Sequence, residues 1–286
     1  MILVTGAAGK TGQAIIRGLH ATGARVRALI RRPEQEGIVL AAGAHEALAG
    51  DMTLESTFDR ALSGIRTIYH ICPNMCAYEV EMGKLAIQWA KRHTVEHFVF
   101  HSVLHPQVRA MPHHWDKLLV EDMLFEAGLP YTILQPVAYM QNIMGSWNGI
   151  INEGKYHVPY PIDTRLGMVD LLDVAQAAAV VMTTPGHHGA TYELCGNEIL
   201  TPKQMASIMS DILEQEVAAV EERIVNWQQN ARHTGMDEEV IKKLTAMFQY
   251  YATYGFWGNS NALRHLIGRD PATFADCVLR TKRVSA

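Results

Sequence analysis

The first twelve residues contain the feature that most restricts what this chain can fold into. A short apolar run leads into Gly6, Gly9 and Gly12, and an amphipathic stretch follows them. Gly6 permits a tight turn, Gly9 lets a ligand approach the backbone, and Gly12 lets a helix pack closely on a strand. The pattern predicts a buried strand joined by a glycine-rich turn to a helix whose N-terminus faces a phosphate.

A second interpretation of the same segment fails on one position. The run from Ala8 to Thr11 resembles the end of the phosphate-binding loop of nucleoside triphosphatases. That loop requires a glycine five residues before Gly9, where this chain has Val4. The spacing therefore favours a dinucleotide site, in which Lys10 lies beside the ligand or in solvent.

Strand-like runs alternate with helical patterns through the first half of the chain. Strands are predicted at residues 2–5, 25–30, 46–48, 67–71, 97–101 and 131–134, and helices at 11–21, 32–42, 54–62, 78–92 and 114–127. This alternation is typical of an α/β fold with a doubly wound parallel sheet of the Rossmann type and helices on both faces.

The second half of the chain is less regular. Residues 201–213 and most of 223–267 read as helical, and the latter are rich in methionine and aromatic side chains. We expect a dinucleotide-binding domain over residues 1–152, completed by about 164–195. Residues 153–286 should form a smaller, mostly helical lobe, partly interleaved with it, that binds a substrate or a partner.

Composition excludes several classes of protein. The 286 residues carry a net charge of −4, which disfavours nucleic acid, and no apolar run approaches the roughly 20 residues that cross a membrane. The four cysteines are scattered without the paired spacing of a zinc site. We therefore expect a cytoplasmic protein with reduced thiols and without a metal, a membrane anchor or a nucleic-acid partner.

Ligands of doubly wound sheets bind beyond the carboxyl ends of the strands, so the residues that follow each strand are the candidates for the site. The predicted cofactor-binding set is Gly6, Ala8, Gly9, Lys10, Thr11, Gly12, Arg31, Arg32, Asp51, Met52, Cys72, Pro73, Asn74, His101, Ser102, Lys117, Pro136, Tyr139 and Asn142.

Two of these positions bear on which nucleotide binds. Arg31 and Arg32 follow the second strand, where an acidic residue would hold the ribose 2′-hydroxyl of NAD. Arginine suits a 2′-phosphate instead, so NADP(H) is the predicted cofactor, with NAD(H) as the weaker possibility. Asp51 has two open interpretations: it contacts the adenine amino group, or it caps the helix that begins at residues 53–54.

The predicted catalytic residues are Ser102, Lys117 and His113. Their spacing resembles the Ser…Tyr-x-x-x-Lys set of short-chain dehydrogenases, in which His113 takes the position of the tyrosine, the acid of that family. Three alternatives stay open: His113 is the acid, Lys117 acts directly, or no acid is present. We favour Lys117 in the site and expect His113 to face solvent beside His114.

The chain as a whole resembles the NmrA-like group of atypical short-chain dehydrogenase/reductases. The resemblance is carried by residues 4–12, 26–31, 50–51, 113–117 with Glu121, 128–136, 139–142 and 263–271. It implies a Rossmann fold that binds NADP(H), or NAD(H) in some members. Some members reduce quinones, aldehydes or triphenylmethane dyes, and others are nucleotide redox sensors that contact regulators without turnover.

Two functions follow from these observations. The first is an NADPH-dependent reductase of a small apolar acceptor, namely a quinone, an aldehyde or a conjugated aromatic compound. Its pocket wall would use Met140, Trp147, Tyr156, Tyr160, Met247, Phe248 and Trp257, and Arg165 is the main residue that could pair with a charged substrate. The second is a non-catalytic NADP(H) sensor that regulates a protein partner; a homodimer stays open for both.

Overall fold

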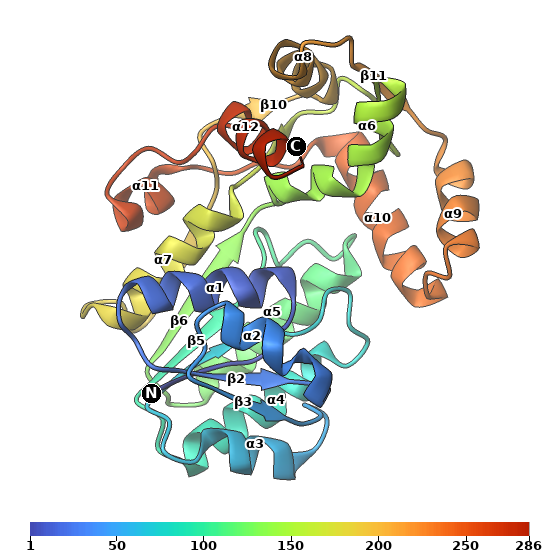
Figure 1. Ribbon diagram of the computed structural model, residues 1–286. Coiled ribbons are helices and arrows are strands. Elements are labelled where there is room, and N and C mark those ends of the chain that lie inside the picture. The colour runs from blue at the N-terminus through green and yellow to red at the C-terminus, as the bar shows by residue number, and fades with distance from the viewer. Residues whose placement is uncertain (286) are drawn as a thin grey trace.

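A computed structural model describes residues 1–285 and contains a seven-stranded parallel sheet. The strand order is β3-β2-β1-β4-β5-β6-β9 (Figure 1). From β1 the chain adds strands toward one side of the sheet as far as β3, and from β4 onward it adds them toward the other side. The strands are β1 (Ile2–Val4), β2 (Val26–Ile30), β3 (Glu46–Ala49), β4 (Thr67–His70), β5 (His97–His101), β6 (Tyr131–Pro136) and β9 (Ala190–Leu194). The doubly wound sheet predicted from the sequence is confirmed.

Helices cover both faces of this sheet, which explains why its strands are apolar on both sides. Leu3 of β1 belongs to one buried cluster, and its neighbours Ile2 and Val4 belong to another. The first cluster lies under α3 (Glu55–Leu62), α4 (Glu79–Arg92) and α5 (Pro112–Glu126). The second lies under α1 (Lys10–Ala21), α2 (Glu36–Ala41) and α7 (Leu171–Thr183).

The remaining elements form a second lobe beyond the carboxyl ends of the strands (Figure 1). Two small sheets pair β8 with β10 and β7 with β11. The elements are η2 (Met140–Ser146), α6 (Trp147–Glu153), β7 (Lys155–Val158), β8 (Leu166–Gly167), β10 (Ile199–Leu200), α8 (Pro202–Leu213), β11 (Ala218–Glu221), α9 (Ile224–His233), α10 (Glu238–Tyr254), α11 (Asn261–Ile267) and α12 (Phe274–Ser285), while η1 (Pro33–Gln35) precedes α2.

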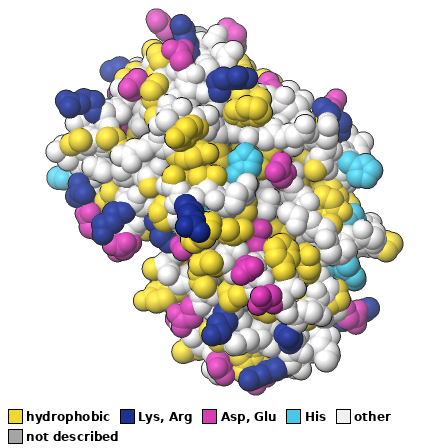
Figure 2. All heavy atoms as spheres, turned by 180° about the vertical axis from the view of Figure 1, so that it is seen from behind, with side chains coloured by type: hydrophobic (Ala, Val, Ile, Leu, Met, Phe, Trp, Pro, Cys, Tyr) yellow, Lys and Arg dark blue, Asp and Glu magenta, His cyan; other side chains and the backbone are white. Residues whose placement is uncertain are grey.

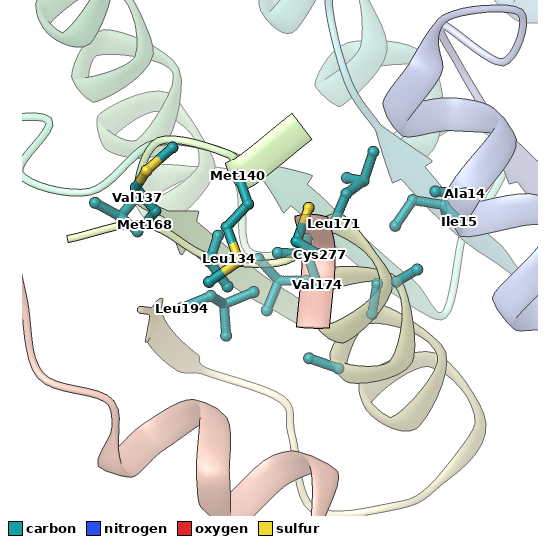
Figure 3. Close-up of a cluster of buried hydrophobic side chains, with 14 of the residues drawn as sticks. Ala14, Ile15, Leu134, Val137, Met140, Met168, Leu171, Val174, Leu194 and Cys277 are labelled. Atoms are coloured by element: carbon teal, nitrogen blue, oxygen red, sulfur yellow. The ribbon is translucent and has the colours of Figure 1, made fainter. Parts of the chain in front are cut away.

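One hydrophobic core runs from the sheet into this lobe. Figure 3 shows Leu134, Met140, Val174 and Cys277 meeting there, from β6, η2, α7 and α12. Three side chains predicted to line a substrate pocket, Met140, Trp147 and Tyr156, are instead buried in this core, with exposed fractions of 1%, 7% and 7%. Burying each one stabilises the fold by about 1.5–3 kcal/mol, so the two lobes are joined by packing.

Among residues 1–285, no helix has the length and apolar character needed to cross a membrane. Seen from behind in Figure 2, acidic and basic side chains are scattered over the molecule, and hydrophobic side chains gather across its middle.

Buried histidines make the stability of this fold sensitive to acid. Burial lowers the pKa of His97 to about 4 and that of His70 to about 3. In the unfolded chain a histidine has a pKa near 6.5. Each such group therefore contributes stability above that value, and the contribution falls as the pH drops from about 6.5 toward the folded-state pKa, by about 1.4 kcal/mol per pH unit.

We expect His97→Asn to flatten this dependence. Urea unfolding measured between neutral pH and pH ~5 should show a slope shallower than that of the wild type by about one proton. His157, which is exposed on β7, supplies the matched control His157→Asn. Equal slopes for the wild type and His97→Asn would contradict the assignment of His97 as a histidine buried in its neutral form.

Candidate functional site

The turn between β1 and α1 has two positions that require glycine. Gly6 has a φ of +55°, and an added Cβ would lie 2.8 Å from the Ile71 carbonyl oxygen. At Gly12 a Cβ would overlap the Gly6 carbonyl oxygen and lie 2.7 Å from the Cα of Ala7. The turn is thus folded tightly against β4 and against the start of α1, as the spacing of the glycines predicted.

This turn presents the N-terminus of α1 to the edge of the sheet. Gly9 is the N-cap and provides no side-chain hydrogen bond, and the first turn contains no acidic residue. The Gln13 side chain of α1 donates a hydrogen bond to the Ala8 carbonyl oxygen at 2.8 Å, and this bond stabilises the turn. Lys10 lies next to it, and partial burial lowers its pKa. Free amides and the helix dipole suit an anion.

Arg31 and Arg32 are exposed where the chain leaves β2. The backbone N–H groups of both residues donate to the Gln35 side-chain oxygen, at 3.1 and 3.0 Å. This contact fixes the turn into η1 and leaves both guanidinium groups outside the turn. The position is the one at which the sequence predicted a contact with a 2′-phosphate.

Asp51 closes the turn that follows β3. Its Oδ1 accepts hydrogen bonds from the backbone N–H and the hydroxyl of Thr53, at 2.9 and 2.8 Å. The N-cap of α3 is Leu54, so the carboxylate braces the turn before the helix instead of capping it. The hydrogen bonds from Thr53 lower the pKa of Asp51, and the charge of Arg31 lowers it further. Met52 is buried beside it.

The three candidates after β4 divide between core and edge. The Cys72 thiol is buried and lies 3.6 Å from His70 Nε2 and 4.0 Å from the Met82 sulfur. Burial raises the pKa of this thiol well above its usual value. Pro73 and Asn74 are exposed at the carboxyl edge. Cys72 can therefore offer a ligand its backbone, while its side chain belongs to the core.

Lys117 of α5 is held at the end of β5 by two partners. Its ammonium donates to Glu79 Oε1 at 2.8 Å and to the His101 carbonyl oxygen at 3.1 Å. The Glu79 side chain is 5% exposed, and that of Lys117 is 15% exposed. Because an ammonium has three donors, one proton remains for a ligand. The structure thus places a fixed positive charge at the carboxyl end of β5, where the sequence predicted the ligand site.

Ser102 and Glu121 lie beside Lys117, on the same face of the sheet. The Ser102 hydroxyl donates to Glu121 Oε1, and the Gln135 side-chain amide donates to both oxygens of that carboxylate, at 2.9 and 3.1 Å. Burial raises the pKa of Glu121, and these hydrogen bonds oppose the rise. The only proton of Ser102 is thus used inside the protein, so Ser102 positions Glu121.

His113 does not face solvent, which corrects the expectation from the sequence. It is half-buried at the start of α5, and its Nδ1 atom is buried without a hydrogen-bond partner among the described residues. Burial lowers its pKa to about 2, assisted by the charges of His114, Lys117 and Lys243. The sequence could not predict this, because α10 covers the start of α5 from a distant part of the chain.

On the other face of the sheet, His101 connects two tyrosines. His101 Nδ1 meets the Tyr69 hydroxyl, and His101 Nε2 lies 2.6 Å from the Tyr139 hydroxyl. Burial raises the pKa of the Tyr139 phenol, and the nearby side chain of Thr11, at the start of α1, opposes the rise. Pro136 is buried at the end of β6, and Asn142 is exposed one turn beyond Tyr139. These residues join the ends of β4, β5 and β6 to the glycine turn.

The second lobe closes over this edge through one ion pair and a row of aromatic rings. Lys243 of α10 donates to Asp116 at 2.8 Å and to the Cys76 carbonyl oxygen at 3.0 Å. Five rings contact one another in the order Trp227, Phe248, Tyr160, Tyr251 and Phe256, with neighbouring centroids 4.9–6.2 Å apart. Of the predicted wall, Tyr160 and Phe248 lie in this row, and Met247 is half-buried beside it.

Trp257 and Arg165 lie beside a cavity that the predicted cofactor residues do not line. Trp257 lines an open cavity of about 590 Å³ together with Tyr250, Tyr254 and Glu193, and none of the predicted cofactor residues borders this cavity. The Arg165 guanidinium is exposed, 5.8 Å from the Trp257 ring centroid. Phe256 of the aromatic row also lines this cavity, and its backbone N–H donates to the Arg165 carbonyl oxygen at 3.0 Å, so Trp257 and Arg165 lie next to one end of the row.

The sequence analysis missed two residues of this site, Glu79 and Tyr69. Glu79 begins α4 and pairs with a lysine 38 positions later, and Tyr69 lies in the middle of an apolar strand. Neither position carries a motif, since a carboxylate at a helix start is ordinarily exposed and a tyrosine in a strand is ordinarily core.

Comparisons with known proteins agree with this geometry. A model of the NmrA-like family matches residues 1–272. An NAD(P)H azoreductase of Xenophilus azovorans is 26% identical over 278 residues, which are 96% of this chain and 96% of that protein.

Solved structures give the same fold. An NADPH-dependent quinone oxidoreductase from Escherichia coli, complexed with NADPH, superposes with a TM-score of 0.87 at 24% identity, covering 99% of this chain and 100% of that one. NmrA, a negative transcriptional regulator in complex with NAD, has a TM-score of 0.81 at 20% identity, covering 99% and 95%. Since the family model spans all but the last residues, this chain belongs to the NmrA-like family.

Proposed function

We propose that this protein is an NADP(H)-dependent reductase of small apolar acceptors. The observation that carries the proposal is the buried Lys117 ammonium, fixed by Glu79 and by the end of β5 on the same sheet edge as the glycine turn. The similarity to an azoreductase and a quinone oxidoreductase supports this class of reaction.

The residues present fit a dinucleotide. The uncapped amides at Thr11 and Gly12 would hold the pyrophosphate, and Arg31 and Arg32 would hold the 2′-phosphate. When bound, the reduced nicotinamide supplies a hydride. The chain itself binds the two reactants side by side and keeps water out of the site. Positioning and exclusion of water are the main contributions that a protein makes to such a transfer.

Lys117 is the residue that we assign to the chemistry of the acceptor. An ammonium held in a nearly dry environment stabilises negative charge that develops on an acceptor oxygen. His113 cannot supply a positive charge in the same way, because its pKa of about 2 leaves no imidazolium at neutral pH. Of the three alternatives that the sequence left open, direct action by Lys117 therefore has the most support.

An apolar acceptor fits the side chains above this edge better than a charged one. Three rings of the aromatic row, Trp227, Phe248 and Tyr160, are partly exposed and offer surfaces for stacking on a flat molecule, while Tyr251 and Phe256 are buried behind them. A charged substrate would need a buried partner of opposite charge, and the Arg165 side chain is exposed. Quinones, aromatic aldehydes and dyes are the acceptors we propose.

The preference for NADP(H) is tested by Arg31→Ala. A charge-assisted contact with phosphate contributes about 1.5–3 kcal/mol, so the variant should bind NADPH roughly 10- to 100-fold more weakly. Its affinity for NADH should not change, because NADH lacks the 2′-phosphate. Calorimetry with both nucleotides measures this, and equal affinities of the wild type for NADPH and NADH would contradict the assignment.

A non-catalytic NADP(H) sensor is the second candidate. Two observations favour it: the Ser102 hydroxyl donates its hydrogen bond to Glu121 and is not available to a substrate, and Lys243 of α10 pairs with Asp116, which is next to Lys117 in the chain. NmrA, a regulator of similar fold, is consistent with this alternative.

Anaerobic NADPH oxidation with a panel of quinones, aldehydes and dyes separates the two functions. We expect the wild type to reduce at least one quinone or dye, and we expect the Lys117→Met variant to lose this activity. Tight NADPH binding with no oxidation across the panel would support the sensor and contradict the reductase.

A further inference from the structure

Three side chains form a continuous hydrogen-bonded row under the proposed cofactor site. Tyr69 comes from β4, His101 ends β5, and Tyr139 follows β6. The Tyr69 hydroxyl meets His101 Nδ1, and His101 Nε2 lies 2.6 Å from the Tyr139 hydroxyl. Tyr69 is 0% exposed and His101 is 4% exposed, so solvent does not supply alternative partners. The protons in this row can therefore be assigned by counting donors and acceptors.

His101 carries a single ring proton at neutral pH. Burial lowers the pKa of His101 to about 3, and the nearby Lys117 charge acts in the same direction. A neutral imidazole has one N–H donor and one bare nitrogen that accepts. One of the two tyrosines must therefore donate to His101, while the other accepts from it.

Tyr69 decides which tyrosine donates. Among residues 1–285, the Tyr69 hydroxyl has one hydrogen-bond partner, His101 Nδ1. If Nδ1 carried the proton, the buried Tyr69 hydroxyl would accept it and its own proton would have no acceptor, which is unfavourable in a dry interior. Tyr69 therefore donates to Nδ1. The imidazole proton is then on Nε2 and is donated to the Tyr139 oxygen.

This direction leaves the Tyr139 proton free to point away from His101. Tyr139 lies between the end of β5 and Thr11 of α1, where the pyrophosphate and the nicotinamide ribose of a dinucleotide would lie. We propose that Tyr69 and His101 direct the Tyr139 proton away from His101, so that the Tyr139 hydroxyl donates to a phosphate or ribose oxygen when NADP(H) is bound. The inference rests on the proposed function for the identity of this ligand.

Tyr139 holds its proton and does not transfer it. The far end of the row is the buried Tyr69, which has no further partner among residues 1–285 from which a proton could be replaced. Burial also raises the pKa of the Tyr139 phenol, against the effect of Thr11. Tyr69 and His101 are thus positioning residues, and Tyr139 is a binding residue.

The tautomer of His101 can be measured without any nucleotide. Nitrogen-15 correlation spectra of the whole protein distinguish an Nε2–H from an Nδ1–H imidazole, and the spectrum of His101→Asn identifies the His101 signals among the 14 histidines. We expect the neutral Nε2–H form in the wild type. An Nδ1–H form, or an imidazolium at neutral pH, would overturn the proposed direction of the row.

Nucleotide affinity tests the role of the hydroxyl. NADPH binding by calorimetry should weaken roughly 10- to 100-fold in Tyr139→Phe if the donor meets a phosphate, and less if it meets a ribose oxygen. Tyr69→Phe should weaken binding by a smaller factor and give a mixture of His101 tautomers, because nothing then fixes Nδ1. The control is Tyr192→Phe on the edge strand β9. This substitution removes another Tyr–His hydrogen bond, the 3.0 Å contact between the Tyr192 hydroxyl and His187.

These outcomes separate the inference from the function on which it rests. A folded Tyr139→Phe variant that binds NADPH as tightly as the wild type would overturn the role of Tyr139 alone. A wild-type protein that binds no NADPH would overturn the proposed function as well, while the tautomer would still report the direction of the row.

Discussion

Lys117→Met should lose acceptor reduction by roughly 100- to 1,000-fold, the usual effect of removing one group that stabilises an oxyanion. Lys117 supplies the positive charge at the end of β5, and methionine keeps its length without that charge. His113→Phe should lose much less, because His113 is neutral and lacks a hydrogen-bond partner at Nδ1 among the described residues. Steady-state NADPH oxidation with a quinone measures both variants. A larger loss in His113→Phe would reverse the assignment.

The same substitution should also destabilise the protein, because it leaves the Glu79 carboxylate buried and unpaired. Removing one partner of a buried ion pair costs about 3–5 kcal/mol in the free energy of unfolding. The double variant Lys117→Met/Glu79→Gln should recover much of that stability and recover none of the activity. Urea unfolding of the three proteins distinguishes the structural role of Lys117 from its chemical role. Recovery of turnover in the double variant would contradict the chemical role.

Gly12→Ala is expected to remove NADPH binding beyond detection, a loss greater than roughly 100-fold. The added Cβ would overlap the Gly6 carbonyl oxygen and lie 2.7 Å from the Cα of Ala7, so the turn has to move away from α1. Both contacts are backbone atoms, which cannot rotate aside as a side chain can, so overpacking should also cost about 1–3 kcal/mol of stability.

Gly37→Ala is the matched control for this change. Gly37 lies in α2, and an added Cβ there meets nothing within 4 Å. Alanine should preserve NADPH binding and slightly favour the helix. Calorimetry and thermal unfolding compare the two variants directly, and a Gly12→Ala protein with wild-type affinity would contradict the tight turn described above.

Local signals in the sequence were sufficient for the sheet and for the tight glycine turn at the carboxyl end of β1. The glycine turn, the alternation of strands with helices, and the arginines after β2 each act through neighbours close in sequence. For the same reason Lys117 could be placed at the end of β5 from its position on the next helix. These features depend on backbone geometry that the local sequence specifies.

Contacts between distant segments account for what the sequence could not predict. His113 is buried because α10, more than a hundred residues later, covers it and ties down Asp116 through Lys243. Met140 and Tyr156 were expected in a pocket wall, yet they pack in the core with α7 and α12. An aromatic or methionine side chain satisfies a core and a pocket wall equally well, so composition could not distinguish the two.

The central claim is hydride transfer from NADPH beside Lys117, and an anaerobic single-turnover experiment tests it most directly. Protein saturated with NADPH, or with NADPH deuterated at the transferred position, is mixed with a naphthoquinone, and the loss of reduced-nicotinamide absorbance is followed. We expect one NADPH to be oxidised per quinone reduced, more slowly with deuterium, and we expect Lys117→Met to bind NADPH without this reaction. An NADPH complex that stays reduced with every quinone, aldehyde and dye offered would contradict the account.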